Sequence, residues 1–249
     1  MAVRLLKTTG HGSFEEVMWD KPEPTAWDIE VKAVMTGVCR SDIDMMNGTF
    51  GPLPLEMQGH EGLGIVTKVG ASIDDVKVGD YVATRGEPAY ADYYNAADSD
   101  CIKVPELSPK YILEPVACAL NCIEQTDSKV GRIGGKILIL GSGFLAWVAY
   151  NTIKLNHLDF EIDVLGRSNK ELWGDRLQQH FADEVSYYDV VIDLGSGTEV
   201  FNADILKNEA LVVFGAQKEV TTDFSNLLWK ACTMIFPSPR TDRFYQCMK

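Results

Sequence analysis

Residues 136–146 read KILILGSGFLA, an apolar run, a glycine turn and the start of a second apolar run. The run Ile137–Leu140 has the length and composition of a buried strand, and Phe144–Leu155 has the length of a helix. A strand, a glycine turn and a helix in this order are typical of the phosphate-binding turn of a dinucleotide fold. The segment therefore predicts a nucleotide-binding domain in the second half of the chain.

More apolar runs follow this segment and alternate with helical or polar stretches. They are Phe160–Leu165, Asp189–Leu194 and Ala210–Phe214, with an edge strand expected at Met234–Phe236 before Pro237. Nearly unbroken apolar runs are typical of parallel strands that are buried on both faces, so the pattern predicts a doubly wound sheet.

The glycine turn offers specific contacts for a cofactor. Gly141 permits the turn and Gly143 lets the backbone approach a pyrophosphate, while Ala146 takes the place of a third glycine. The amides near Phe144 and Leu145 are expected to face the phosphates at the helix N-terminus.

The end of the second strand bears on the choice between NAD and NADP. A carboxylate usually holds the cofactor ribose here when no 2′-phosphate is present, but Asp163 lies in mid-strand and Gly166 follows Leu165. Arg167 and Ser168 offer a cation and a hydroxyl that suit a 2′-phosphate. We therefore expect NADP, with NAD still open; the alternative is that Arg167 is only a solvated cation.

The first half of the chain has a different pattern, with short β-like runs separated by glycine and proline. These runs are Val31–Met35, Gly62–Gly70, Val76–Val82, Tyr90–Tyr94 and Cys101–Val104. They predict a β-rich, partly barrel-like domain. Ser108–Gln125 then has the apolar spacing of a helix, so we place a domain boundary near residue 110, with one domain at 1–110 and a second at 111–249.

Two glycine-rich segments in the first domain carry metal-ligand residue types. They are GVCRSD at residues 37–42 and GHEGLG at residues 59–64, and they supply Cys39 and His60. A third ligand comes from Glu61 or from Glu114, and the residues alone do not separate the two. A thiolate, an imidazole and a carboxylate suit a catalytic zinc ion with one open position. The alternative is a buried thiol at Cys39 and a hydrogen-bonded turn histidine at His60.

Taken together, these segments resemble the medium-chain dehydrogenase/reductase family, which includes zinc alcohol, polyol, threonine and glucose dehydrogenases. The matching motifs are GVCRSD, GHEGLGIV, VGDYV at residues 78–82, YADY at residues 90–93, the Glu114-Pro115 pair and the glycine turn. The resemblance implies a GroES-like catalytic domain followed by a Rossmann domain, and cofactor-dependent hydride transfer.

The resemblance also implies roles for the candidate ligands. Cys39 and His60 match ligands of the one catalytic zinc, and Glu114 matches the glutamate that replaces a second cysteine in the polyol and glucose branch. Glu61 matches a residue that is a direct ligand or a close neighbour of the metal in different members.

Three residues after Cys39 match further family positions. Ser41 matches the hydroxyl that passes the substrate proton outward, and Asp42 matches the carboxylate that orients the zinc-bound histidine. Arg40 matches a residue that reaches the cofactor pyrophosphate, although it is equally compatible with a solvated loop cation.

The chain departs from the family pattern at three places. The segment between the second strand and Asp189 is short, so we expect one β-α unit of the nucleotide-binding domain to be trimmed. Only seven residues, 83–89, separate Val82 from Tyr90, so the cysteine-rich lobe that holds a structural zinc in many relatives is missing and we expect no structural zinc. The sequence ends at Lys249, soon after the expected edge strand, so we expect part of the usual substrate wall to be absent.

Composition limits the classes of partner. The formal charge of −13 over 249 residues argues against nucleic acid and against an anionic membrane surface. Six scattered cysteines and the lack of a signal peptide favour the cytoplasm. The apolar run Ala231–Phe236 predicts a sheet edge that is paired in a homodimer.

The resulting hypothesis is a zinc-dependent, NADP-preferring oxidoreductase that acts on a secondary alcohol, polyol or sugar, or on the corresponding carbonyl. Two alternatives stay open: a metal-free quinone or enone reductase with the same fold, and a catalytically inert dinucleotide-binding protein.

Overall fold

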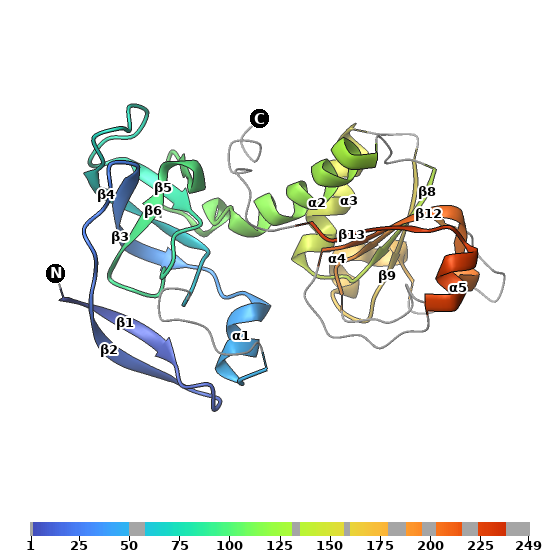
Figure 1. Cartoon of the computed structure of the whole chain (residues 1–249), viewed down its shortest axis with the longest axis horizontal. Helices are drawn as coiled ribbons and strands as arrows, with labels where there is room; N and C mark the ends of the chain where they lie inside the picture. The colour runs from blue at the N-terminus through green and yellow to red at the C-terminus, as the bar shows by residue number, and fades with distance from the viewer. Residues whose placement is uncertain are drawn as a thin grey trace. The chain divides into compact units, whose positions relative to one another are not determined.

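The computed structural model describes residues 2–49, 58–130, 135–156, 160–178, 188–195, 203–215 and 224–237. The chain forms two compact units that divide between Ala117 and Cys118, inside helix α2 (Glu114–Val130), as Figure 1 shows by colour along the chain. In the described ranges, no helix is long and apolar enough to cross a membrane.

The first unit is built from antiparallel strands. They are β1 (Ala2–Thr8), β2 (Phe14–Asp20), β3 (Asp28–Thr36), β4 (Gly62–Val69), β5 (Tyr81–Thr84), β6 (Tyr93–Ala97) and β7 (Cys101–Lys103). Strands β1 and β2 form a hairpin, and the other five form one sheet in the order β6-β3-β4-β5-β7. A short helix, α1 (Arg40–Met46), follows β3, and two 3₁₀ turns lie at Asp98–Asp100 and Pro109–Tyr111.

The core of this sheet follows from the alternation of side chains along its strands. Ile29 and Val31 of β3 are fully buried and belong to one cluster with Val66 of β4 and Val82 of β5. Tyr94 of β6 completes the cluster. The unit is therefore β-rich with a buried apolar interior, as the sequence predicts.

Three elements of this unit begin later than the sequence pattern suggests. The strand expected at Tyr90–Tyr94 is β6, which starts at Tyr93. The strand expected at Val76–Val82 starts only at Tyr81, because Gly79 has a φ of +95° and the Asp80 carboxylate accepts the Lys77 amide, which together make a turn. Helix α2 starts at Glu114, where Pro115 has no N–H to donate and so suits the first helical turn.

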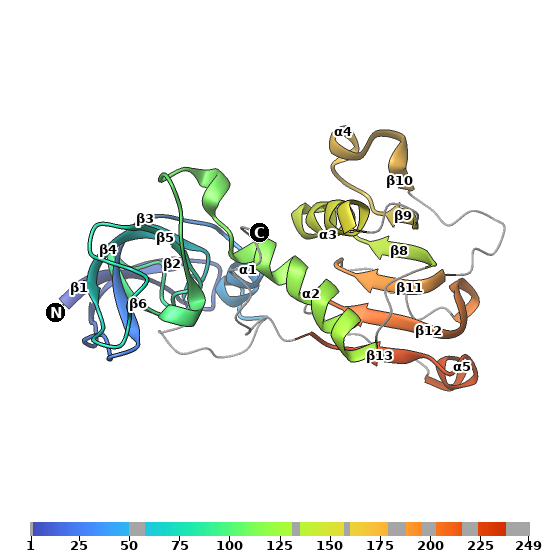
Figure 2. The same ribbon diagram turned by 90° about the horizontal axis from the view of Figure 1, so that it is seen from above.

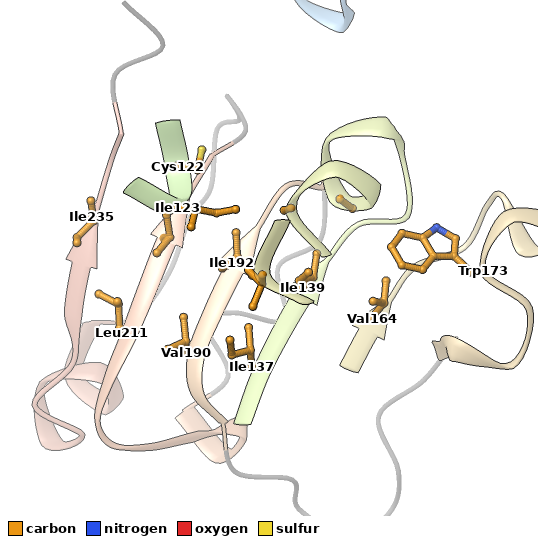
Figure 3. Packing of buried hydrophobic residues seen from close by; sticks show 14 residues of the cluster. Cys122, Ile123, Ile137, Ile139, Val164, Trp173, Val190, Ile192, Leu211 and Ile235 are labelled. Carbon is orange, nitrogen blue, oxygen red and sulfur yellow. The ribbon is translucent and has the colours of Figure 1, made fainter. Parts of the chain in front are cut away.

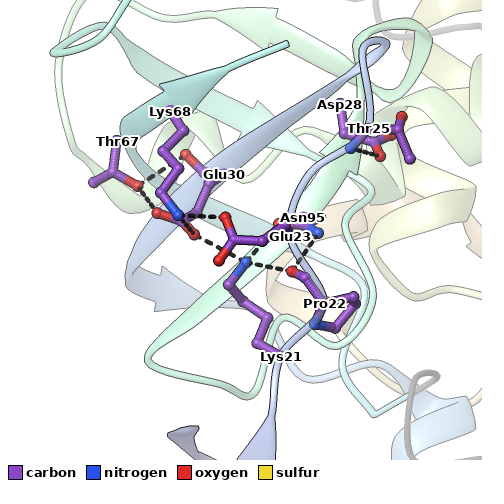
Figure 4. A network of polar contacts seen from close by, with 9 residues as sticks. All are labelled: Lys21, Pro22, Glu23, Thr25, Asp28, Glu30, Thr67, Lys68 and Asn95. Carbon is purple, nitrogen blue, oxygen red and sulfur yellow. Dashed lines mark hydrogen bonds and ion pairs between the residues drawn. The ribbon is translucent and has the colours of Figure 1, made fainter. Parts of the chain in front are cut away.

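A buried ion pair ties the end of β2 to β3 in the first unit (Figure 4). Lys21 Nζ lies 2.9 Å from Glu30 Oε2, and the two side chains are 0% and 4% exposed. Lys21 also donates to Asn95 Oδ1 at 2.9 Å, while Thr67 donates to Glu30 Oε1 at 2.9 Å. Burial by itself raises the pKa of the Glu30 carboxyl, but the hydrogen bonds from Lys21, Thr67 and Lys68 outweigh burial and lower that pKa below its ordinary value.

The second unit is a six-stranded parallel sheet with helices on its two faces. Its strands are β8 (Lys136–Leu140), β9 (Glu161–Leu165), β10 (Leu177–Gln178), β11 (Tyr188–Asp193), β12 (Leu206–Phe214) and β13 (Thr233–Ile235). Its other helices are α3 (Phe144–Asn156), α4 (Lys170–Trp173) and α5 (Phe224–Trp229), with 3₁₀ turns at Gly174–Arg176 and Ala203–Ile205.

The strand order is β10-β9-β8-β11-β12-β13, and Figure 2 shows β9, β8, β11, β12 and β13 side by side in that order. After β8 the chain adds β9 and β10 on one side of it, and then adds β11, β12 and β13 on its other side. This is the strand order of dinucleotide-binding folds, in which ligands bind at the carboxyl ends of the two central strands.

Alternate residues of each strand enter clusters on opposite faces of the sheet. Ile137 and Ile139 of β8 belong to the cluster drawn in Figure 3, which residues of α2, α3 and α4 cover. Leu138 and Leu140 belong to the other cluster, with Leu227 of α5. Burial on both faces explains why these strands read as continuous apolar runs.

The β-α unit that we expected to be trimmed is shortened and not lost. Strand β10 is present and pairs in parallel with β9, but it has only two residues, Leu177 and Gln178. Helix α4, which precedes it, has four residues. The connection from β9 to β10 contains only this short helix and a 3₁₀ turn. Elements this short do not produce a recognisable helical period in the sequence.

Strand β13 ends the sheet among the described residues, as expected for an edge. Next to it, Phe236 is 70% exposed and stacks on Phe214 with 4.9 Å between the ring centroids. The homodimer expected through this edge stays a prediction.

Candidate functional site

Cys39, His60 and Glu61 lie together in the first unit. One ligand atom from each of them, a sulfur, a ring nitrogen and a carboxylate oxygen, lies within 4.8 Å of the other two. The His60 side chain is 12% exposed and Glu61 is 7% exposed, so the group is largely shielded from water. Among the described residues this is the only group of histidine, cysteine and acidic side chains that meets this geometry.

Cys39 is positioned by the start of helix α1. It is the N-cap residue, with extended backbone angles of φ −84° and ψ 159°. Its amide donates to Asp42 Oδ2 at 2.8 Å, which is the reach-back contact of a capping box. An acidic residue in the first turn also complements the positive end of the helix. The spacing Cys-x-x-Asp therefore fixes both side chains through local helix chemistry.

Glu61 is positioned by its pairing with the segment before α1. The Gly37 amide donates to the Glu61 carbonyl at 2.9 Å, just ahead of strand β4. A Cβ atom at Gly37 would clash with Glu61 Oε2, so only glycine leaves room for this carboxylate. The two glycine-rich segments thus bring their ligands together by direct backbone contact.

Asp42 links the two ligand segments. It is 1% exposed, and its Oδ1 lies 3.7 Å from His60 Nδ1. Within the described part of the chain, this oxygen is buried without a hydrogen-bond partner. A histidine that binds a metal with one ring nitrogen usually offers the other one to a carboxylate of this kind.

The pKa values of these side chains depend on one another, because acidic groups crowd around His60. Burial lowers the pKa of His60, but a hydrogen bond with Cys39 and the nearby carboxylates outweigh burial and raise it to about 9. Burial and the charge of Glu114 raise the pKa of the Glu61 carboxyl to about 7. Acidic neighbours therefore favour a cation at this place, either the imidazolium or a metal ion.

The spacing of these atoms is compatible with a metal. Ligands about 2.0–2.3 Å from a tetrahedral zinc are about 3.3–3.7 Å apart, and the three atoms here all lie within 4.8 Å of one another. The donor set of sulfur, nitrogen and oxygen is one that zinc accepts, and three protein ligands leave a fourth position open.

Glu114 lies outside the group of three. It is 4% exposed, and its Oε1 lies 3.5 Å from Arg85 Nε. Its charge still acts on His60 and Glu61, so it is close enough to influence both. Arg85 was not a candidate in the sequence, because nothing in its local pattern distinguishes it from a loop cation.

The other predicted residues near Cys39 lie on helix α1. Ser41 is half-buried in the first turn. Arg40 has an 84% exposed side chain, and its Nε lies 2.9 Å from Asp44 Oδ1 one turn later. Its expected contact with a cofactor stays a prediction.

The glycine turn of the second unit has the geometry expected of it. Gly141 has a φ of +112°, which favours glycine, and its amide donates to the Leu165 carbonyl at 2.8 Å. A Cβ atom at Gly143 would meet no atom within 4 Å, so the space in front of this residue is open. The turn lies at the carboxyl end of β8, next to β11, where the strand order reverses.

Ser142 joins this turn to the end of β9. The Ser168 amide donates to Ser142 Oγ at 3.2 Å, and the side chains of Asn169 and Trp173 donate to the Ser142 carbonyl at 2.8 Å and 3.0 Å. The loop that contains Arg167 and Ser168 is therefore anchored beside the glycine turn. The sequence offered no signal for this role of Ser142.

Arg167 and Asp163 differ in their surroundings. Arg167 is exposed, and it makes no hydrogen bond or ion pair with any residue in the described ranges. The Asp163 carboxylate accepts the Tyr188 hydroxyl at 2.8 Å and lies 3.4 Å from Lys136 Nζ. Asp163 is thus occupied within the sheet, as its mid-strand position suggests.

Comparison with known proteins gives matches to both units. The family model described as "Alcohol dehydrogenase GroES-like domain" matches residues 25–106. A probable quinone oxidoreductase of Leishmania amazonensis is 27% identical over 162 residues, 64% of this chain and 47% of that protein. A D-xylulose reductase A of Aspergillus oryzae is 27% identical over 163 residues, 50% of this chain and 45% of that protein. The chain thus spans about half the length of the curated relatives it matches.

A solved structure extends the likeness over the whole chain. The acetophenone reductase of Geotrichum candidum in complex with NAD superposes with a TM-score of 0.80 at 20% identity, over 99% of this chain and 86% of that one. The two units correspond to a GroES-like domain and a Rossmann domain, so the predicted fold class is confirmed.

Proposed function

We propose that the chain is a member of the medium-chain dehydrogenase/reductase family and a zinc-dependent oxidoreductase that transfers hydride between a nicotinamide cofactor and a secondary alcohol, polyol or sugar; the GroES-like family match, the polyol reductase relatives and the shared fold support this. The single observation that carries the proposal is the convergence of Cys39, His60 and Glu61 within 4.8 Å, with the Asp42 carboxylate beside His60. NADP is the preferred cofactor in this proposal.

In this proposal Cys39, His60 and Glu61 hold one zinc ion, and Asp42 orients the imidazole. His60 Nδ1 faces Asp42, which leaves Nε2 for the metal. When bound, zinc supplies the Lewis acidity that makes the alcohol proton easier to lose. We assign the third position to Glu61 and not to Glu114, since Glu61 belongs to the group of three and Glu114 lies 3.5 Å from a guanidinium nitrogen.

The protein's own groups handle the proton and the cofactor. Ser41, two residues after Cys39 and half-buried, passes the substrate proton outward. Gly141 and Gly143 receive the pyrophosphate at the N-terminus of α3 with the amides of Phe144 and Leu145. Arg167 and Ser168, anchored beside that turn through Ser142, receive the 2′-phosphate of NADP. A nicotinamide cofactor held in this way would supply the hydride chemistry.

A metal-free quinone reductase is the second candidate, since one relative is named a probable quinone oxidoreductase. The clustering of three metal-ligand residue types argues against it, because a reductase without a metal does not need a cysteine, a histidine and a glutamate brought together in this way.

Zinc content and turnover together test the proposal. We expect about one zinc per chain in the parent protein, turnover of a polyol with NADP, and loss of both in Cys39→Ala. Glu61→Gln should lose zinc, whereas Glu114→Gln, the matched control, should keep most of it. Turnover without zinc would favour the quinone-reductase candidate, and neither zinc nor turnover would favour an inert dinucleotide-binding protein.

A further inference from the structure

Tyr90 contacts both of the segments that supply the candidate metal ligands. Its hydroxyl donates to Asp42 Oδ2 at 2.9 Å and lies 3.4 Å from the Gly37 carbonyl. Gly37 and Asp42 flank Cys39 in sequence. Through its side chain, Tyr90 is therefore bonded to the segment that contains the sulfur ligand.

The backbone around Tyr90 holds the other segment. The Tyr90 amide donates to the Gln58 carbonyl at 3.2 Å, and the Ala89 amide donates to the Gly59 carbonyl at 2.9 Å. A Cβ atom at Gly59 would lie 2.5 Å from Tyr90 Cδ1, so the ring rests directly on this glycine. Gly59 has a φ of +79° and precedes His60. Residues 89–90 thus set the path of the chain just before the nitrogen ligand.

The two oxygens of Asp42 have different partners. Oδ2 accepts two donors, the Cys39 amide at 2.8 Å and the Tyr90 hydroxyl at 2.9 Å. Oδ1 accepts none in the described part of the chain and faces His60 Nδ1 at 3.7 Å. Two donors on one oxygen fix the rotation of the carboxylate, so that the other oxygen is kept for the histidine.

The phenol keeps its proton in this place. Tyr90 is half-buried, and burial together with the negative charge of Asp42 raises its pKa above the ordinary value. The hydroxyl is therefore a constant donor to the carboxylate.

From these contacts we propose that Tyr90 is a positioning residue of the metal centre: its hydroxyl fixes the Asp42 carboxylate against His60 Nδ1, and its ring fixes the backbone before His60. The inference rests on the proposed function, because it takes Cys39, His60 and Glu61 to be zinc ligands. In the described part of the chain the hydroxyl of Tyr90 is hydrogen-bonded to Asp42 and Gly37, and its ring lies against Gly59, so Tyr90 acts through these neighbours of the ligands.

Without the hydroxyl, the carboxylate has a single donor, the Cys39 amide. Either oxygen can then accept that donor, so the carboxylate faces His60 in the required orientation for only part of the time. Loss of a hydrogen bond behind a metal ligand typically costs about 10–100-fold in metal affinity. Because Tyr90→Phe keeps the ring and removes only one of the two donors, we expect about a tenfold loss, at the lower end of that range.

The test compares two tyrosine-to-phenylalanine variants of the full chain. Tyr90→Phe removes the donor to Asp42. Tyr94→Phe is the matched control, because the Tyr94 hydroxyl is a buried hydrogen-bond partner of Thr84 Oγ1 at 2.8 Å in the same unit. Zinc dissociation constants are measured by competition with a chelator. The thiolate charge-transfer and ligand-field bands of the cobalt-substituted proteins report ligand geometry, and the melting temperatures of the metal-free proteins report stability.

We expect about tenfold weaker zinc binding and altered cobalt bands in Tyr90→Phe, with both unchanged in Tyr94→Phe even if both metal-free variants melt lower. Equal zinc affinity and equal cobalt bands in the parent and Tyr90→Phe would overturn the inference and leave the proposed function intact. A parent protein that binds no zinc would refute the proposed function, and the role of Tyr90 with it.

Discussion

Replacement of Arg167 with alanine should convert a preference for NADP into near-indifference between the two cofactors. Arg167 follows β9, where dinucleotide folds place the residue that recognises the cofactor ribose. It is exposed and has no partner among the residues that the structure describes, while the next residue, Ser168, is bonded to Ser142 of the glycine turn. The guanidinium is thus free for a ligand, and the loop that carries it is held in place.

The magnitude follows from the contact that would be lost. A hydrogen bond to a charged group contributes about 1.5–3 kcal/mol. Solvent screening at an exposed arginine places the contribution at the lower end of that range, and about 1.4 kcal/mol corresponds to a tenfold change in affinity. We therefore expect NADP(H) to bind at least about tenfold more tightly than NAD(H). Arg167→Ala should lose about that factor for NADP(H) and less than about twofold for NAD(H).

Isothermal titration calorimetry of both cofactors at one fixed salt concentration measures this difference. Lys207→Ala is the matched control: it removes a positive charge from the same unit, but near the start of β12, at the amino-terminal edge of the sheet and away from the glycine turn. Raising the salt concentration should reduce the preference of the parent protein for NADP(H) over NAD(H), because salt screens the contact between Arg167 and the 2′-phosphate. Equal affinities in the parent, or equal losses for both cofactors in Arg167→Ala, would refute this reasoning.

Two further predictions concern pH and stability. Zinc must displace protons from its ligands, which include His60, with a pKa of about 9, and Glu61, with a pKa of about 7, so zinc affinity should rise as the pH rises. Chelator competition at a series of pH values measures this affinity, and a flat profile would contradict the prediction. Glu30→Gln leaves the Lys21 ammonium buried without its counter-charge and should lower the free energy of unfolding by about 3–5 kcal/mol. Glu23→Gln, at the exposed end of the same network, should cause a much smaller loss. Because the Glu30 pKa is lowered, the contribution of this ion pair to the free energy of unfolding is present at neutral pH and is lost as the pH falls through that pKa. If denaturant titrations gave equal losses of unfolding free energy for the two variants, the buried ion pair would not be the cause of those losses.

The amino-acid sequence by itself determined the features that depend on local pattern. The strand and glycine turn at residues 137–143 lie where the apolar run and the glycines predict them, because strand burial and a positive φ leave marks in consecutive residues. The pairing of Cys39 with His60 was also visible, since each lies in a short glycine-rich segment. The cap that Asp42 forms on the amide of Cys39 needs only a spacing of three residues.

The tertiary structure alone decided which distant groups meet. It placed Glu61 with Cys39 and His60 and set Glu114 beside Arg85, which the spacing of these residues along the chain does not show. It also placed the hydroxyl of Tyr90 on Asp42, although Tyr90 lies in a different strand-loop segment. The physical reason is that such contacts depend on how separate segments pack, and the free energy of packing depends on the whole core and leaves no periodic mark along the chain.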